Sequence, residues 1–376
     1  MVHTEEPYFG HNNVLQLVLQ KMETRTNEGL SVLHVAAAAG HVEVVQLLID
    51  CGADIHIADT RHGMTPLHHA ARGGHREVVQ LLVLDHSADI NLADTGQMGM
   101  TPLHYAAGSG ELEMVRFLVL DRGADMHSVD QWWGRTALHY AAGCGHPAVV
   151  QFFLDRMQAA ADARNRMTPL HYAADRGHLE VVRQLLAADR GVVRLADTYG
   201  RTPLQCAARK DYPQVVQFIV DSVVHTGEEL AMAPLRDAID NGNLEVVQVL
   251  LDRGADVNCA DPEDGKTPLH HAAMGGRHEV VQLLMHRGAA INIADSPCGR
   301  TPLHYAAARG HLEVVRLLAV DIPTVSDMWS GMTPLHCAAA GGHLEVVRYL
   351  VVDRGADIHD AVSGRWSGMS RPHLVL

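Results

Sequence analysis

The chain has 376 residues, a formal net charge of −14 at pH 7, 47% hydrophobic residues and 20% charged residues. This ordinary balance excludes a disordered chain, and the lack of an apolar run of about eighteen residues excludes a membrane-inserted helix. The acidic balance argues against general nucleic-acid binding, which requires a net basic face.

The first residues, MVHTEEPYF, do not combine a basic region with an apolar run, so we expect no secretory signal. The six cysteines are scattered and form no CxxC pair. In a chain of this length, such cysteines favour single thiols in a reducing compartment. We therefore expect an intracellular protein, cytoplasmic or nuclear.

The string GHNNVLQLVL at residues 10–19 aligns with GHVEVVQLLI at residues 40–49. The first of these strings predicts the second helix of an incomplete repeat. We therefore expect residues 1–28 to form an N-terminal partial repeat or cap.

A repeated motif, TPLHxAA, dominates residues 29–361 and predicts ten repeats. Its copies are about 31 to 36 residues apart. Eight copies are strong, and two, SVLHVAA and APLRDAI, are weaker. The copies begin at Ser31, Thr65, Thr101, Thr136, Thr168, Thr202, Ala233, Thr267, Thr301 and Thr333.

Each repeat predicts two short helices and a hairpin. Threonine is a good helix N-cap, and proline suits the first helical turn. A glycine such as Gly177 or Gly310 ends the first helix, because glycine tolerates the left-handed conformation. The second helix, GHLEVVRLL or a variant, has one apolar and one charged face. A turn-rich segment then leads to the next threonine.

The array is irregular near residues 211–235. Asp211-Tyr212-Pro213 replaces the usual GHL, and the stretch up to Leu235 lacks the normal turn. This stretch is interpreted either as a drifted repeat or as a hinge or specialised site. Beyond it, residues 362–376 predict a truncated repeat and a C-terminal tail.

These strings resemble the ankyrin repeat family, whose signature contains T-P-L-H-x-A at a period of 33 residues. The resemblance covers about residues 10 to 361. It implies an all-α solenoid of stacked helix pairs with short β-hairpin loops along one edge. It also implies that the first helix of each pair lines a concave side.

Exposed hairpin tips are the first candidate binding surface. All four tryptophans fall in predicted tips, and tryptophan, tyrosine and arginine are preferred binding hot spots. The alternative is that Trp132 and Trp133 pack on neighbouring hairpins. The candidate tip residues are Trp132, Trp133, Arg135, Tyr199, Arg201, Lys266, Arg300, Trp329, Met332 and Trp366.

The predicted first helices supply the remaining candidates. Tyr105, Tyr140 and Tyr172 share one position and would form an aromatic strip, although a half-buried structural position is the favoured interpretation. Arg176 and Arg209 belong to a polar set at the ends of these helices. For this set, solvated surface charge is the competing interpretation.

The 27 histidines do not predict a metal or catalytic site. Most of them recur once per repeat, whereas a metal needs ligands that converge on one point. We interpret them as repeat-building residues that form hydrogen bonds to turn backbone. No nucleophile or dinucleotide motif is found either, so no cofactor and no metal are expected.

The predicted function is an ankyrin scaffold or adaptor, monomeric, that binds a protein partner through its concave face and hairpin tips. One alternative is an effector or inhibitor that docks on a target protein. Another is an atypical enzyme, since fold alone does not fix function. Its site would include Asp175, Arg176, Arg209, Lys210, Arg236, Asp237 and Asp240.

Overall fold

A computed structural model describes residues 25–27, 29–224, 232–296, 298–320, 326–328 and 330–358. The chain divides into two compact units, Met1–Cys206 and Ala207–Leu376. The predicted N-terminal cap therefore lies almost entirely outside the described residues, and the predicted tail at 362–376 lies wholly outside them.

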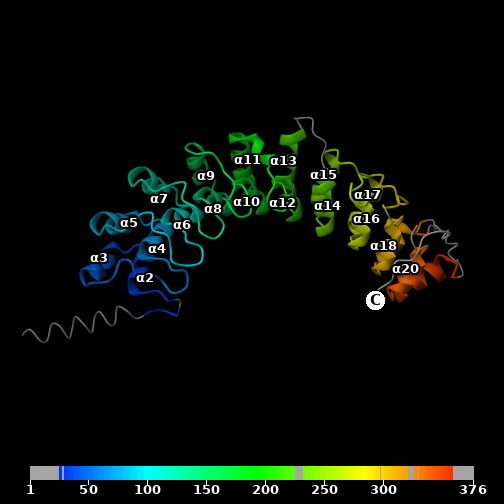
Figure 1. The fold of residues 1–376 in the computed structure, drawn as a ribbon, viewed down its shortest axis with the longest axis horizontal. Coiled ribbons are helices and arrows are strands. Elements are labelled where there is room, and N and C mark those ends of the chain that lie inside the picture. Colours follow the sequence, from blue (N-terminus) through cyan, green and yellow to red (C-terminus); the bar gives the residue numbers. More distant parts are fainter. Residues whose placement is uncertain are drawn as a thin grey trace, which may run out of the picture. The chain divides into compact units, whose positions relative to one another are not determined.

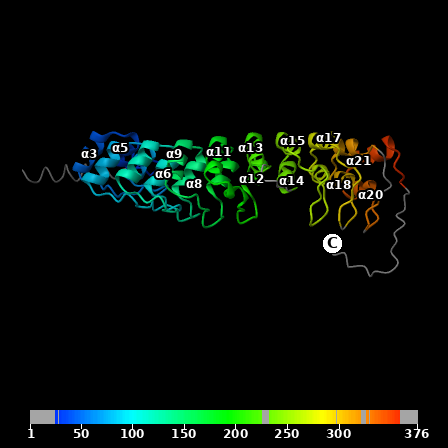
Figure 2. The same ribbon diagram turned by 90° about the horizontal axis from the view of Figure 1, so that it is seen from above.

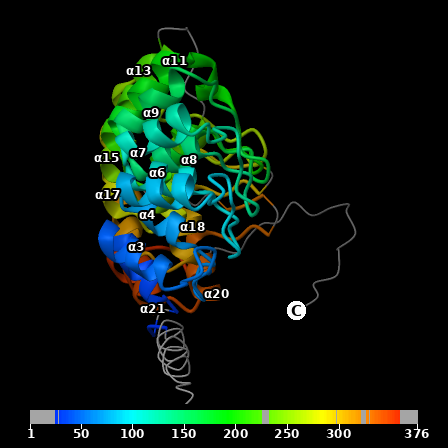
Figure 3. The same cartoon turned by 90° about the vertical axis from the view of Figure 1, so that its left-hand side faces the viewer.

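We call the first helix of each repeat the inner helix and the second the outer helix. In the first unit, inner and outer helices alternate along the chain and form two rows (Figure 1). The loops before the inner helices project to one side of the helices (Figures 2 and 3). The inner helices are α2 (Val32–Ala39), α4 (Pro66–Arg72), α6 (Pro102–Ser109), α8 (Ala137–Cys144), α10 (Pro169–Asp175) and α12 (Pro203–Arg209). The outer elements are α3 (Val42–Asp50), α5 (Arg76–Gln80) with η1 (Leu81–Asp85), α7 (Leu112–Arg116) with η2 (Phe117–Asp121), α9 (Pro147–Leu154), and α11 (Leu179–Ala188) with η3 (Arg190–Arg194).

The second unit repeats this pattern, and the boundary between the units falls inside α12. Its inner helices are α14 (Met232–Asn241), α16 (Pro268–Met274), α18 (Pro302–Ala308) and α20 (Pro334–Ala340). Its outer elements are α13 (Pro213–Val224), α15 (Leu244–Asp252), α17 (His278–His286), α19 (Leu312–Leu318), and α21 (Leu344–Arg348) with η4 (Tyr349–Asp353).

The alanine pair of the motif explains why successive inner helices pack together. Ala106 and Ala107 of α6 are fully buried, and α6 packs against both α4 and α8. Because alanine has only a methyl side chain, neighbouring helices can approach closely. The outer helices bury their valine pairs, such as Val149 and Val150 of α9. The core of each unit thus lies between its two rows of helices.

The predicted helix ends are confirmed. Thr168 is the N-cap of α10 with extended backbone, and proline occupies the first turn. Gly177 and Gly310 adopt left-handed conformations with φ of 76° and 74°. In the irregular stretch, Asp211 stands where other repeats have this glycine and also has a positive φ of 62°. Residues 225–231, the rest of that stretch before α14, lie outside the described residues.

The loops before the inner helices are tight turns rather than strands. In the loop before α8, the Asp130 N–H donates to Arg135 O at 2.9 Å and the Gly134 N–H donates to Asp130 O at 3.1 Å. The described part of the chain contains helices and turns but no β-strand. The predicted all-α repeat stack is therefore confirmed, with hairpin-shaped loops that are too short to be strands. None of the described helices is long and apolar enough to cross a bilayer.

Candidate protein-binding surface

A buried aspartate shapes eight hairpins of the described part of the chain. Asp130 is 1% exposed, and its side-chain Oδ1 accepts hydrogen bonds from the Trp133 N–H at 2.6 Å and the Gly134 N–H at 3.0 Å. The tip is therefore held in one conformation before any partner arrives. Equivalent aspartates accept hydrogen bonds from their own tip N–H groups at Asp59, Asp94, Asp162, Asp197, Asp261, Asp295 and Asp327.

The second oxygen of this aspartate receives a side chain from the following inner helix. Tyr140 donates its hydroxyl to Asp130 Oδ2 at 2.7 Å, and Arg135 donates its Nε to the same oxygen at 2.8 Å. Burial alone would raise the pKa of Asp130, but the hydrogen bonds from Tyr140, Trp133 and Arg135 hold it below its usual value. A tyrosine or histidine of the following helix makes this contact at five hairpins, those of Asp59, Asp94, Asp130, Asp162 and Asp295.

The three tyrosines of the predicted aromatic strip share this contact. Tyr105 donates to Asp94 at 2.9 Å and Tyr172 donates to Asp162 at 2.8 Å, as Tyr140 does to Asp130. All three are half-buried, and burial together with the adjacent carboxylate raises the pKa of each hydroxyl. Because their hydroxyl groups are already engaged, these tyrosines have a structural role. Their role in binding stays a prediction.

Trp132 and Trp133 lie at one tip together with an arginine from the next tip. Trp132 is 43% exposed and Trp133 is half-buried. The Arg164 guanidinium lies 5.0 Å from the Trp132 ring centroid and 5.2 Å from that of Trp133. Its Nη1 also donates to Trp132 O at 3.1 Å. The two tryptophans therefore pack in part against the neighbouring hairpin, as the alternative interpretation held, while much of the Trp132 ring remains accessible.

Backbone hydrogen bonds join successive tips of the first unit into one edge. In these bonds, Thr95, Gln131, Arg164 and Thr198 each donate their N–H to the preceding tip. The accepting carbonyls belong to Gly63 (3.0 Å), Met98 (2.8 Å), Trp133 (3.0 Å) and Asn165 (2.8 Å), respectively. Tyr199, at the last of these tips, is 75% exposed.

The predicted cationic tip residues are already paired. Arg135 pairs with Asp130 at 2.8 Å and Arg201 with Asp197 at 2.7 Å. In the second unit, Arg300 pairs with Asp327 at 3.2 Å, and Lys266 pairs with Asp264. These partners fix the cations beside the tips, which leaves only part of each side chain accessible.

The remaining predicted residues are dispersed. Arg176 donates to Gly143 O at 3.0 Å, Arg209 is exposed at the end of α12, and Met332 is half-buried. Trp329 and Trp366 lie outside the described residues. The first unit therefore contains Trp132, Trp133, Arg135, Arg176, Arg201 and the tyrosines, whereas the second unit contains Arg209, Lys266, Arg300 and Met332.

The histidines of the TPLH motif bridge neighbouring repeats, which confirms their predicted bonds to turn backbone. In α10, His171 Nδ1 accepts the Thr168 N–H at 3.1 Å and Nε2 donates to Arg201 O at 3.1 Å. The same pattern recurs at His34, His68, His104, His139, His270 and His304. Throughout the described ranges, no three His, Cys, Asp or Glu side chains converge on a possible metal site.

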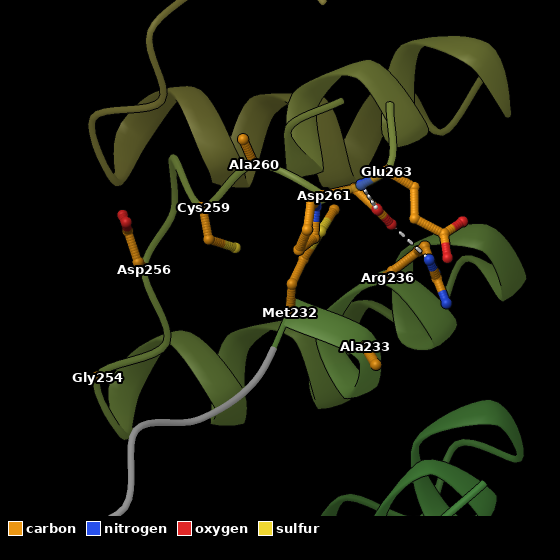
Figure 4. A pocket seen from close by; sticks show the side chains of 10 residues that line it. Met232, Ala233, Arg236, Gly254, Asp256, Cys259, Ala260, Asp261 and Glu263 are labelled. Carbon is orange, nitrogen blue, oxygen red and sulfur yellow. Dashed lines mark hydrogen bonds and ion pairs between the residues drawn. The ribbon is translucent and has the colours of Figure 1, made fainter. Parts of the chain in front are cut away.

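A hollow of about 910 Å³ lies in the second unit between the start of α14 and the loop that follows α15 (Figure 4). Arg236 Nη1 donates to Asp261 Oδ2 at 2.6 Å across it. Burial and the neighbouring Asp256 raise the pKa of the Cys259 thiol to about 11. A thiol with so high a pKa is a poor nucleophile at neutral pH. The Asp261 carboxylate is already paired with Arg236. The hollow is thus lined by an ion pair between Arg236 and Asp261 and by a thiol that is protonated at neutral pH.

Sequence reasoning missed Arg164 and Arg166. Arg166 occupies the position where other tips have glycine, and its φ of 57° is left-handed. The missing glycine before Met167-Thr168 was visible in the sequence. The stacking of Arg164 on Trp132 and Trp133 was not visible, because it depends on how two hairpins about 32 residues apart align.

Comparisons with known proteins agree with the geometry. A family model described as ankyrin repeats (3 copies) matches residues 6–94, 58–130, 103–195, 157–227 and 288–361, and one described as ankyrin repeats (many copies) matches residues 235–285. Among solved structures, the chain is similar to the ankyrin repeat domain of Bcl-3, a unique member of the IkappaB protein family. That match has 29% identity and a TM-score of 0.50, and it covers 57% of this chain and 99% of the other. A search of curated proteins found no match.

Proposed function

Because the chain belongs to the ankyrin repeat family, we propose that it is a scaffold or adaptor that holds a protein partner on its inner helices and hairpin tips. Ankyrin repeats are protein-interaction modules, and a solenoid offers the extended surface that such a role needs. The central contact of the proposed surface is the Trp132–Trp133 tip of the first unit.

One observation carries this choice of surface. A tryptophan that is 43% exposed lies on a hairpin held by a buried aspartate, a tyrosine and an arginine. An exposed aromatic ring on a rigid support loses little conformational entropy on binding, which is typical of interface hot spots. The rest of that tip is fixed in place by contacts within the repeat stack.

The test is affinity capture with the purified full chain, the Trp132→Ala/Trp133→Ala variant and the Leu344→Ala variant side by side. Leu344, on an outer helix and 73% exposed, is the matched control for losing an exposed apolar side chain. Captured proteins are then purified, and their dissociation constants are measured for all three chains.

We expect the tryptophan variant to bind about 30-fold more weakly, the equivalent of about 2 kcal/mol, while the leucine variant binds like the wild type. Circular dichroism checks that each variant is folded. Equal binding by a folded tryptophan variant would show that the tip is not the binding surface. If the wild-type chain captured no specific protein, the scaffold function itself would be wrong.

A further inference from the structure

We propose that the tip at residues 163–166, together with Trp132 and Trp133, binds carboxylate side chains of an extended acidic protein segment. This inference rests on the proposed function and specifies the chemistry of the partner. Four observations support it: the charge of this tip, the held position of Arg164, the backbone of Arg166 and the distance between Arg164 and Trp132.

The tip at residues 163–166 carries two arginines, Arg164 and Arg166, although the chain as a whole has a net charge of −14. The tip segments 60–63, 95–99, 131–134, 163–166 and 198–201 contain no aspartate or glutamate. The aspartate that precedes each tip is buried and already hydrogen-bonded within the hairpin. This edge therefore presents arginine and aromatic groups and complements a partner that supplies negative charge.

Arg164 is held in place but not neutralised. Two tryptophan rings lie 5.0 and 5.2 Å from its guanidinium, and Nη1 donates to Trp132 O at 3.1 Å. The side chain is exposed and forms no ion pair with any residue of the described ranges. A guanidinium has five N–H donors in a fixed planar fork, and such a fork binds carboxylates in a bidentate manner. The stacking fixes the fork beforehand, which lowers the entropy lost on binding.

Arg166 has a backbone conformation that glycine adopts more readily than arginine. Its φ of 57° is left-handed, and the equivalent tip positions are glycine at Gly63, Gly99, Gly134 and Gly200. A side chain in this conformation is strained relative to glycine. The Arg166 side chain is nonetheless exposed to solvent. This left-handed residue places a second arginine two residues from Arg164, at a tip where its neighbours carry glycine.

The occupant is an extended peptide rather than a nucleic acid. The Arg164 guanidinium lies 5.0 Å from the Trp132 ring, and side chains two positions apart on one face of an extended chain are about 6–7 Å apart. An acidic residue two positions from an apolar one would therefore reach Arg164 and Trp132 together. A nucleic acid, in contrast, would meet long-range repulsion from a chain with a charge of −14.

The probe is a fluorescent twelve-residue peptide in which Leu and Glu alternate at every second position, with serine between them. Binding to the full chain is followed by fluorescence anisotropy at low and at physiological salt. Arg164→Gln and Arg166→Gly are the test variants. Arg316→Gln is the control, because it removes a charge paired with Glu313 on the outer helix α19.

We expect binding by the wild-type chain that weakens as salt rises, an about tenfold loss in each test variant, and no change in the control. The melting temperature of Arg166→Gly should be at least that of the wild type, because glycine relieves the left-handed strain. An affinity lost while stability is kept is the signature of a binding role.

Three results would overturn the inference. The first is equal binding of the peptide and its Lys-for-Glu counterpart, and the second is tighter binding of a single-stranded oligonucleotide of equal charge. The third is a lower melting temperature in Arg166→Gly, which would make Arg166 structural. If a captured partner bound the arginine variants as tightly as the wild type but lost affinity for the tryptophan variant, only this inference would fail and the proposed function would stand.

Discussion

The repeated histidine of the TPLH motif acts as a bridge between two repeats. Its Nδ1 accepts from the N-cap threonine of its own helix, and its Nε2 donates to a carbonyl of the next hairpin, as at His171 with Thr168 and Arg201. This pair of bonds defines the neutral Nε2–H tautomer. One side chain thereby satisfies buried backbone groups on both sides of a repeat boundary.

Replacing His171 should show how much each half of the bridge contributes. Gln205 stands at the same position in α12, where its Oε1 accepts the Thr202 N–H at 3.0 Å, so His171→Gln keeps the cap acceptor. His171→Ala loses both bonds and should lower the free energy of unfolding by about 2–3 kcal/mol. The stability of His171→Gln should lie between that of the wild type and that of His171→Ala. Urea unfolding measures the order, and equal stability of both variants would contradict the bridge.

Tyr140 tests the link between hairpin and helix. Its hydroxyl donates to Asp130 at 2.7 Å and accepts from Arg135 Nη2 at 2.6 Å. Tyr140→Phe removes both bonds around a buried carboxylate and should cost about 1–2 kcal/mol in urea unfolding. Tyr199→Phe, at an exposed tip, should change stability by less than about 0.5 kcal/mol. Unchanged stability of Tyr140→Phe would show that the hydrogen bonds of the Tyr140 hydroxyl do not stabilise the hairpin.

Three of the described outer helices end in a π-helical turn, and a one-residue insertion accounts for this turn. The sequence FLVLDRGAD around η2 is one residue longer than VLLDRGAD at the end of α15. The same extra residue occurs at η1 and η4. Widening one turn absorbs the insertion and returns the following loop to register. This difference was visible in the uneven repeat spacing, but periodicity alone does not say where the extra residue goes.

Deleting the inserted residue should therefore be tolerated. Leu120 lies in η2 and is exposed, so its deletion should restore a regular helix end and change stability by less than about 1 kcal/mol. Deleting Leu251 from the regular α15 should cost several times more, because it shifts the residues that follow out of register. Thermal melting of the two deletion variants compares them. Equal losses of stability in the two variants would show that the π-helical turn does not absorb an inserted residue.

Across the molecule, the bridging histidines couple folding to pH. Burial, partly offset by nearby carboxylates, lowers the pKa of His68 and of His139 to about 4. In the unfolded chain each histidine would have a pKa of about 6.5. Between about pH 4 and pH 6.5 the unfolded state therefore binds more protons than the folded state. The stability that these groups contribute is complete above about pH 6.5 and is lost as pH falls towards 4.

Stability should therefore fall by up to about 1.4 kcal/mol per pH unit for each such histidine in this window. Urea unfolding at several pH values between 7 and 4.5 measures the slope. The double variant His68→Gln/His139→Gln should show a shallower slope, since glutamine does not titrate. A slope that these substitutions leave unchanged would mean that other groups control the acid response.

The repeat stack was predictable because its determinants are local. Thr168, Pro169 and Gly177 fix both ends of α10 within ten residues, and the motif repeats this solution. The binding edge was predictable only in part. Trp132 could be placed at an exposed tip from sequence, whereas its contact with Arg164 depends on the alignment of two hairpins. The engagement of Arg201 by Asp197 was also overlooked, although the four-residue spacing was visible.

The most direct test of the account is hydrogen–deuterium exchange of the full chain with and without its captured partner. We expect new protection at residues 131–135 and 163–166, where tip N–H groups adjoin Trp132 and Arg164. We expect no change in outer helices such as α9. Protection confined to the outer helices, with the tips unchanged, would contradict the claim that this protein binds its partner through the hairpin edge.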